Sequence, residues 1–490
     1  MRCIVIGSGI TGMTAALLLA RQGHDVTVIE ACEHAAPLLC GFRRNGLHYD
    51  TGFHCGGGVH QDGILRLWLR VLGVESSLEG ITTAHSDVFL FTDGKEYRLP
   101  SGLQAVVAAS ERQFPGSGEP MEKFLLLISQ KLASSPYLNP AIRNEPKGIL
   151  EDAGCLNDYL DKAGFPPHLR AMLSSRCLLY GVPPSLASWR DYALVAGPYF
   201  QSCGSWYGGG AALVDVLKHA LQEAGVILRL GCAVNAIEAD TIKGVHSVVL
   251  KDGTRMLCER CFFTGHPSQL QSLLSHGLLR PAYLHHIADL PETDAALLLF
   301  AETYDALRDD ESLFLLPSPD EMTTRDTDIS GAAIMAKGSI YVYCGRPAVD
   351  GRKPVMAVSL IPSANLPEGN PLPRSSSYVA WKRHAVESLR LAIEHRVPGL
   401  CGAWRIIDAA TPLTMRHWIH GSTGSLYGVS HQRSSMPLLP PTRVPGLFLA
   451  GQNVLLPGVL GGIVSAAVAV GFAFGHDTVL KEFRACTVKG

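Results

Sequence analysis

The sequence has almost no excess of charge of either sign. Its 490 residues include 42 basic and 44 acidic side chains, for a formal net charge of −2. Proteins that hold nucleic acid or an anionic surface through electrostatics need a clustered basic stripe, and the chain shows none. We therefore expect no nucleic acid partner.

The chain also lacks the cysteine and histidine patterns typical of disulfide frameworks and zinc sites. The 13 cysteines are scattered, and only Cys258 and Cys261 have C-x-x-C spacing. Because a zinc site needs a second such pair or a pair of histidines, we interpret these two as buried strand residues and expect no metal site. The N-terminus lacks the regions of a secretory signal peptide, so we expect reduced thiols and a cytoplasmic protein.

Several catalytic motifs have no match in the chain. It contains no G-x-S-x-G elbow, no H-E-x-x-H helix and no phosphate loop with lysine. A bound cofactor would then carry the chemistry, while the protein positions the substrate and excludes water. The length predicts two or three domains rather than one core.

Segments between the motifs also have recognisable patterns. Helical periodicity predicts helices at residues 63–72, 102–114, 120–133, 211–224 and 376–396. Asp93-Gly94 predicts a hairpin turn, and residues 362–374 predict a proline-rich loop on the surface.

The first thirty residues have the pattern of a βαβ unit. Residues 3–6 form an apolar run that predicts a buried parallel strand, and G-x-G-x-x-G follows directly, at Gly7, Gly9 and Gly12. Residues 14–21 then supply alanine and leucine at helical spacing, and residues 26–29 predict a second strand. This context is the one that the glycine motif requires for dinucleotide binding.

Each glycine of that motif has a physical purpose. Gly7 permits the tight turn, Gly9 lets the backbone approach a pyrophosphate, and Gly12 lets helix and strand pack closely. Glu30 closes the second strand 18 residues beyond Gly12, near the distance expected for the acid that binds the ribose hydroxyls. There is no second complete motif after a strand, so we predict one Rossmann-like nucleotide site.

The longest uncharged run lies near the C-terminus. Residues 454–475 are 22 residues without charge, long enough for a transmembrane helix. Pro457 and several glycines interrupt this run, and residues 446–450 before it read as a buried strand. We therefore predict a strand, a glycine turn and a buried helix that lies under a ligand or against a sheet.

Other segments carry a resemblance to a known family. F-R-R-N-G at residues 42–46, D-x-G-x-H at residues 50–54 and the segments at 410–414, 424–428 and 444–453, together with the fingerprint, resemble phytoene desaturases, carotenoid isomerases and retinol saturases. These form a branch of the amine-oxidase-like FAD superfamily. The resemblance implies bound FAD and an α/β fold: a discontinuous Rossmann-like FAD-binding domain (1–60, 201–284, 405–490) and an inserted α+β substrate-binding domain (61–200, 285–404).

The resemblance also implies roles for particular residues. His54 would lie beside the isoalloxazine, the backbone of Val234 would contact the adenine side, and Trp418 and Tyr427 would line the substrate cavity. The C-terminal cofactor contacts would come from Gly451, Gln452, Gly461 and Gly462.

The sequence departs from the family pattern at two places. Residues 35–37 read Ala-Ala-Pro where the family has a pair of glycines, and a Cβ and a proline ring would crowd a close backbone approach. Gln452 stands where much of the superfamily has an acid. An amide can still donate to and accept from ribityl hydroxyls, so flavin binding survives at Gln452 with less local charge near the flavin.

The resulting functional hypothesis is an FAD-dependent oxidoreductase that acts on carbon–carbon double bonds of a long apolar polyene or isoprenoid, by desaturation, saturation or isomerisation. One alternative is a flavin amine oxidase, which needs an aromatic cage beside the flavin. Another is a non-catalytic lipid or prenyl-group carrier of the same fold, whose members have degraded fingerprints. Because such a substrate is nearly insoluble in water, we also expect peripheral contact with a membrane; the electron partner stays open.

Overall fold

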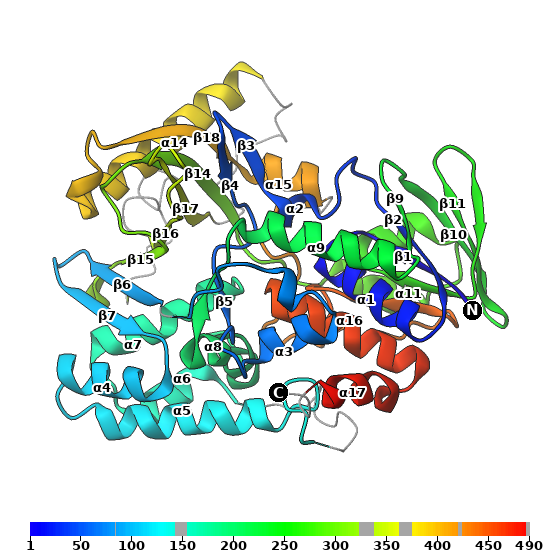
Figure 1. Cartoon of the computed structure of the whole chain (residues 1–490), viewed down its shortest axis with the longest axis horizontal. Coiled ribbons are helices and arrows are strands. Elements are labelled where there is room, and N and C mark those ends of the chain that lie inside the picture. The colour runs from blue at the N-terminus through cyan, green and yellow to red at the C-terminus, as the bar shows by residue number, and fades with distance from the viewer. Residues whose placement is uncertain (84, 143–153, 323–337, 362–374, 420–423, 487–490) are drawn as a thin grey trace.

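The computed structural model describes residues 1–83, 85–142, 154–322, 338–361, 375–419 and 424–486 (Figure 1). Two larger sheets organise the described chain. One has five strands and the other seven. The predicted proline-rich loop at residues 362–374 lies outside the described residues.

The five-stranded sheet is parallel and contains the predicted βαβ unit. Its first strand, β1 (Arg2–Ile6), pairs with β2 (Asp25–Ile29) and β13 (Arg260–Phe263), so that Ile4 lies opposite both Thr27 and Cys261. Helix α1 (Ile10–Arg21) connects β1 to β2. Distant stretches of the chain complete the sheet, in the order β19 (Leu447–Leu449), β13 (Arg260–Phe263), β1 (Arg2–Ile6), β2 (Asp25–Ile29) and β9 (Ile227–Arg229).

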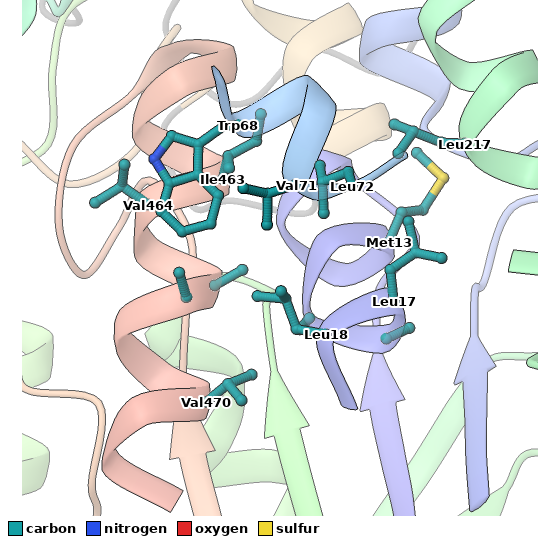
Figure 2. Close-up of a cluster of buried hydrophobic side chains, with 14 of the residues drawn as sticks. Met13, Leu17, Leu18, Trp68, Val71, Leu72, Leu217, Ile463, Val464 and Val470 are labelled. Carbon is teal, nitrogen blue, oxygen red and sulfur yellow. The ribbon is translucent and has the colours of Figure 1, made fainter. Parts of the chain in front are cut away.

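The C-terminal apolar run is a strand followed by a buried helix, as predicted. Helix α16 (Gly458–Phe474) packs on α1, and α3 (Ile64–Val71) covers both. Figure 2 shows Trp68 of α3 beside Ile463 and Val464 of α16, with Leu18 of α1 pointing toward α16. A search of the described residues for a helix with the length and apolar character to cross a membrane found none.

The seven-stranded sheet is mixed. The predicted turn at residues 93–94 joins the hairpin of β6 (Ser86–Phe91) and β7 (Glu96–Pro100), and β15 (Glu311–Leu316) lies parallel to β6. Helix α14 (Ser376–Arg396) covers one face, with Leu389 and Ile393 packed against Leu297 and Leu299 of β14. The strand order is β18 (Trp404–Ala410), β14 (Ala295–Thr303), β17 (Lys353–Ile361), β16 (Ile340–Cys344), β15 (Glu311–Leu316), β6 (Ser86–Phe91) and β7 (Glu96–Pro100).

Helices surround these sheets. In Figure 1, α4 and α5 lie along the lower left and α14 at the top. The helices predicted at residues 63–72, 102–114, 120–133 and 211–224 are present. The bounds are α2 (Pro37–Cys40), α4 (Leu103–Gln113), α5 (Gly118–Ala133), α6 (Leu156–Ala163), α7 (Pro167–Ser174), α8 (Trp189–Gln201), α9 (Gly209–Glu223), α10 (Leu270–Leu273), α11 (Pro281–Ala288), α12 (Pro319–Met322), α15 (Pro412–Ile419) and α17 (His476–Ala485).

Smaller strand pairs complete the fold. The antiparallel sheet β10 (Val234–Asp240), β11 (Gly244–Leu250) and β12 (Arg255–Leu257) lies at the right of Figure 1. Two short ribbons join β3 (Phe42–Arg44) to β4 (Leu47–Tyr49), and β5 (Gly56–Gly57) to β8 (Cys203–Gly204). The division of the chain into two domains stays a prediction. Strand β18 lies at the start of the last predicted FAD-binding segment, and it pairs with β14 of the predicted substrate-binding segment.

Candidate active site

A cavity of about 630 Å³ is lined by residues of both large sheets. It brings together nearly all of the site residues predicted from the sequence, and Gly12 is the exception. The predicted residues that line it are Gly7, Gly9, Glu30, His54, Val234, Trp418, Tyr427, Gly451, Gln452, Gly461 and Gly462.

The glycines of the fingerprint differ in what surrounds them. A Cβ at Gly9 would meet no protein atom within 4 Å, whereas a Cβ at Gly12 would lie 1.9 Å from the Gly7 carbonyl oxygen. Gly7 has a φ of +102°, a conformation that favours glycine. The geometry therefore agrees with a turn at Gly7, a ligand beside Gly9 and close helix packing at Gly12.

Two helices begin at this end of the cavity. Gly9 and Ile10 at the start of α1, and Gly458 at the start of α16, all belong to the lining. A Cβ at Gly462 would lie 2.7 Å from Ile10 Cγ2, so this glycine allows the two helices to approach. The first turn of each helix offers unpaired N–H groups and a positive dipole end, which suit a pyrophosphate.

Glu30 has a second role that the sequence did not reveal. Its Oε2 accepts hydrogen bonds from the Ser8 amide at 2.8 Å and the Ser8 hydroxyl at 2.7 Å, and its Oε1 accepts one from the Cys32 amide at 3.0 Å. The Ser8 hydroxyl in turn accepts from the Ala36 amide at 3.0 Å. Glu30 thus fixes the glycine turn, and because a carboxylate has about four acceptor sites, it retains capacity for ribose hydroxyls.

The loop before α16 is fixed by two residues that the sequence reasoning missed. The Ser465 hydroxyl accepts from the Gly451 amide at 2.8 Å. His431 Nε2 donates to the Gln452 carbonyl oxygen at 2.5 Å. Burial lowers the pKa of His431, which keeps the imidazole neutral. His431 and Gln452 lie far apart in the sequence, and no motif surrounds Ser465. The sequence therefore held no local signal of either contact.

His54 lines the cavity and has one unsatisfied ring nitrogen. Its Nδ1 is buried and has no hydrogen-bond partner among the described residues. Burial lowers the pKa of His54 to about 4, so the ring is neutral near pH 7. Leaving a buried polar atom without a partner costs about 1–3 kcal/mol. Because Nδ1 itself is closed off from the cavity, the predicted position of His54 beside a flavin stays a prediction.

The other part of the cavity is an apolar wall from the seven-stranded sheet. Leu298 of β14 and Tyr341 of β16 both pair with Val358 of β17, and all three line the cavity. Alternation along β17 places Leu360 on the same face, while Val355 and Ala357 pack under α14. Sequence reasoning missed this row because it depends on the register of distant strands.

The two predicted substrate residues differ in exposure. Tyr427 is partly buried, and burial raises the pKa of its phenol to about 12, so the hydroxyl stays protonated. Trp418 on α15 is 39% exposed while also lining the cavity. This combination places Trp418 where the cavity meets solvent.

Comparison with known proteins identifies the family. The family described as flavin containing amine oxidoreductase matches residues 10–470. The chain belongs to this family. FAD is accordingly its cofactor, and the predicted resemblance and the α/β fold class are confirmed.

The curated relatives include enzymes named for polyenes and carotenoid precursors. The chain is 23% identical to human all-trans-retinol 13,14-reductase over 94% of this chain and 84% of that protein. It is 38% identical to a 4,4'-diapophytoene desaturase of Staphylococcus haemolyticus over 70% of this chain and 71% of that protein.

Solved structures show the same fold at low identity. An oxidoreductase from Methanosarcina mazei has a TM-score of 0.63 and 14% identity, over 95% of this chain and 99% of that one. Cyclohexylamine oxidase from Brevibacterium oxydans has a TM-score of 0.59 and 16% identity, over 96% of this chain and 98% of that one.

Proposed function

We propose that this protein is an FAD-dependent oxidoreductase that transfers hydride to or from a carbon–carbon double-bond system of a long apolar polyene or isoprenoid. The observation that carries the proposal is the cavity, whose lining includes both the dinucleotide fingerprint and the apolar row Leu298, Val358 and Tyr341. A flavin bound there would supply two-electron chemistry to a substrate on the sheet side.

The residues of the chain have separable tasks in this proposal. Gly9 and the first turns of α1 and α16 hold the pyrophosphate, and Glu30 holds the ribose. The apolar wall excludes water and orients an extended hydrocarbon along the sheet, because its lining offers few polar partners. Neutral His54, which lines the cavity, would lie beside the flavin.

The curated relatives favour this substrate class over amines. Their names describe a reduction of all-trans-retinol and a desaturation of diapophytoene, two directions of the same exchange at a carbon–carbon bond. The amine oxidases among the solved structures share less than 25% identity with this chain, so that likeness reports the fold alone.

The test is spectroscopic. The purified protein should be yellow with about one FAD per chain, and after anaerobic photoreduction its flavin should be reoxidised by all-trans-retinol or by another long polyene, with two hydrogen atoms gained by the product. Alternatively, a more saturated polyene should reduce the oxidised flavin and lose two hydrogen atoms. Aerobic turnover of an amine with peroxide release, and no exchange with any polyene, would refute the proposal.

We further propose that the substrate enters from a lipid surface beside α5. Leu127 of α5 is 41% exposed, and Lys131, one turn later on the same face, lines the cavity. The adjacent Leu126 is 56% exposed. With a net charge of −2, attachment to membranes would depend on apolar contact and respond little to salt.

Flotation with neutral liposomes tests this entry route. Wild-type protein should float at both low and high salt. Leu126→Ser combined with Leu127→Ser should weaken membrane binding by about 30-fold or more, since exposed leucines of this kind each contribute about 1–2 kcal/mol when buried. Leu391→Ser on α14, where Leu391 is 51% exposed, is the matched control and should float like wild type. Equal flotation of all three proteins, or none by wild type, would contradict the route.

A further inference from the structure

Three residues beside the cavity form a cluster of metal-ligand type. They are Cys55, His85 and Cys203, and one ligand atom of each lies within 4.8 Å of the other two. Both cysteines are free thiols. Cys203 is 2% and His85 is 7% exposed, while Cys55 follows His54 in the cavity lining. Among the described residues this is the one group of three or more such side chains with this proximity.

Backbone pairing holds the three residues together, so their proximity does not depend on rotamers alone. The β5–β8 ribbon pairs Gly56 with Gly204 and thereby fixes the strands that carry the two cysteines. The Thr82 amide donates to the Ser205 carbonyl oxygen at 2.9 Å, and a Cβ at Gly204 would lie 1.8 Å from the Thr82 carbonyl oxygen. The close approach of the segment before His85 to β8 therefore requires glycine at position 204.

The imidazole of His85 is oriented as in a metal ligand. Its Nε2 lies 3.1 Å from Asp87 Oδ1, which leaves Nδ1 as the nitrogen available to the cluster. Asp87 is itself buried and paired with the guanidinium of Arg176. Metal-binding histidines commonly donate their other N–H to a carboxylate, which fixes the tautomer and the ring orientation.

A divalent cation held by two thiolates and a neutral imidazole would add no net charge to this buried region. The Asp87–Arg176 pair sums to zero, and a neutral imidazole adds no charge. If a metal replaced the two thiol protons, the resulting thiolates would carry a charge of −2, and a divalent cation would cancel it without leaving an unpaired buried charge. A divalent metal that replaces the two thiol protons makes the whole group neutral.

We propose that Cys55, His85 and Cys203 bind one Zn²⁺, with a water molecule as the fourth ligand. Two thiolates and one imidazole are a ligand set that zinc prefers. The ligands come from three separate stretches of the chain, so the ion would tie the His54-bearing segment to β8 and to the segment that leads into β6. This site is independent of the proposed reaction and would fix one wall of the cavity.

The first experiment measures metal content. Wild-type protein, purified without a histidine tag, is incubated with Zn²⁺, desalted and analysed by mass spectrometry of the elements. We expect about one zinc per chain in wild type, and at least a tenfold lower content in Cys203→Ala. Cys344→Ala is the matched control, because Cys344 is also a fully buried cysteine and lies outside the cluster. This variant should keep its zinc.

A second measurement uses only the wild-type protein, in case Cys203→Ala does not fold. Replacement of Zn²⁺ by Co²⁺ should give the intense d–d bands of a tetrahedral site with thiolate ligands, at wavelengths beyond the flavin absorption. The proposal would be overturned if wild type retained no zinc after incubation, or if wild type and folded Cys203→Ala held equal zinc. It would also be overturned by the Co²⁺ spectrum of an octahedral aqueous ion, or by a disulfide between Cys55 and Cys203 in the isolated protein.

Discussion

The two ends of the cavity are built from different parts of the peptide. At the nucleotide end, backbone groups form the surface: the Gly7–Gly9 turn and the first turns of α1 and α16. At the apolar end, side chains form it, from strands whose residues pair across long separations, such as Leu298 with Val358. The first end depends on local spacing in the sequence, and the second depends on sheet register.

This difference determines what a substitution should change. A Cβ added at the nucleotide end occupies space that a cofactor needs, so its effect should appear in flavin content. A polar atom added at the apolar end leaves the backbone cradle intact, so its effect should appear in substrate affinity. Variants that separate these two readouts test the comparison directly.

The largest effect is expected at the fingerprint. Gly9→Leu should fold, because its Cβ would meet no protein atom within 4 Å and its φ of −59° suits any residue. Its affinity for flavin should fall by more than about 100-fold, since the side chain fills the pyrophosphate space. Gly12→Leu should instead lose about 3 kcal/mol or more of stability, through its clash with the Gly7 carbonyl. Flavin absorbance and thermal melting distinguish the two, and a stable, yellow Gly9→Leu protein would contradict the assignment.

The same contrast explains how far the sequence could predict the structure. Strand, glycine turn, helix and Glu30 follow one another within thirty residues, so their periodicity predicted the unit and its cavity position. The helix at 376–396 was equally visible as a periodic segment.

The row Leu298, Val358 and Tyr341 was not visible, because each strand reads only as an apolar run until the pairing of β14, β17 and β16 selects one face. The cluster of Cys55, His85 and Cys203 escaped for the same reason: its ligands have no shared spacing.

The next prediction concerns the apolar end. Val358→Asn should leave FAD content unchanged and lower polyene affinity by about tenfold, because a polar amide in an apolar wall lacks partners and costs about 1–3 kcal/mol. Val379→Asn is the surface control, since Val379 on α14 is 43% exposed, and it should change neither readout. Flavin absorbance and a polyene titration of the reduced protein provide the measurements. Loss of flavin in Val358→Asn would show that the two ends are not separable.

A smaller, pH-dependent effect is expected at the nucleotide end. Burial lowers the pKa of His431 in the folded protein, whereas the unfolded chain has the ordinary value of about 6.5. Below that value the unfolded state binds the proton more readily, so stability is present above pH 6.5 and is lost as the pH falls toward the folded-state pKa.

His431→Gln tests this expectation, because an amide can still donate to the Gln452 carbonyl oxygen but does not titrate. The variant should lose about 1 kcal/mol at pH 7, and the melting temperatures of the two proteins should converge at pH 5. A constant difference between pH 7 and pH 5 would show that His431 is not the titrating group.

The smallest effect is expected at residues 35–37, where the sequence suggested crowding. Ala36 has a φ of +45°, a left-handed conformation that costs an L-residue about 1 kcal/mol. Ala36→Gly relieves that strain, but it loses a buried methyl group worth about 0.8 kcal/mol and raises the entropy of the unfolded chain, so the net change should be within about 0.5 kcal/mol. Ala16→Gly is the control: Ala16 is fully buried within α1 and has no strain to relieve, so its substitution should cost about 2 kcal/mol of stability.

If the loop has merely been reshaped, neither Ala36→Gly nor Pro37→Gly will change the FAD dissociation constant in a fluorescence titration. Tighter FAD binding by Pro37→Gly would show instead that the proline ring crowds the cofactor.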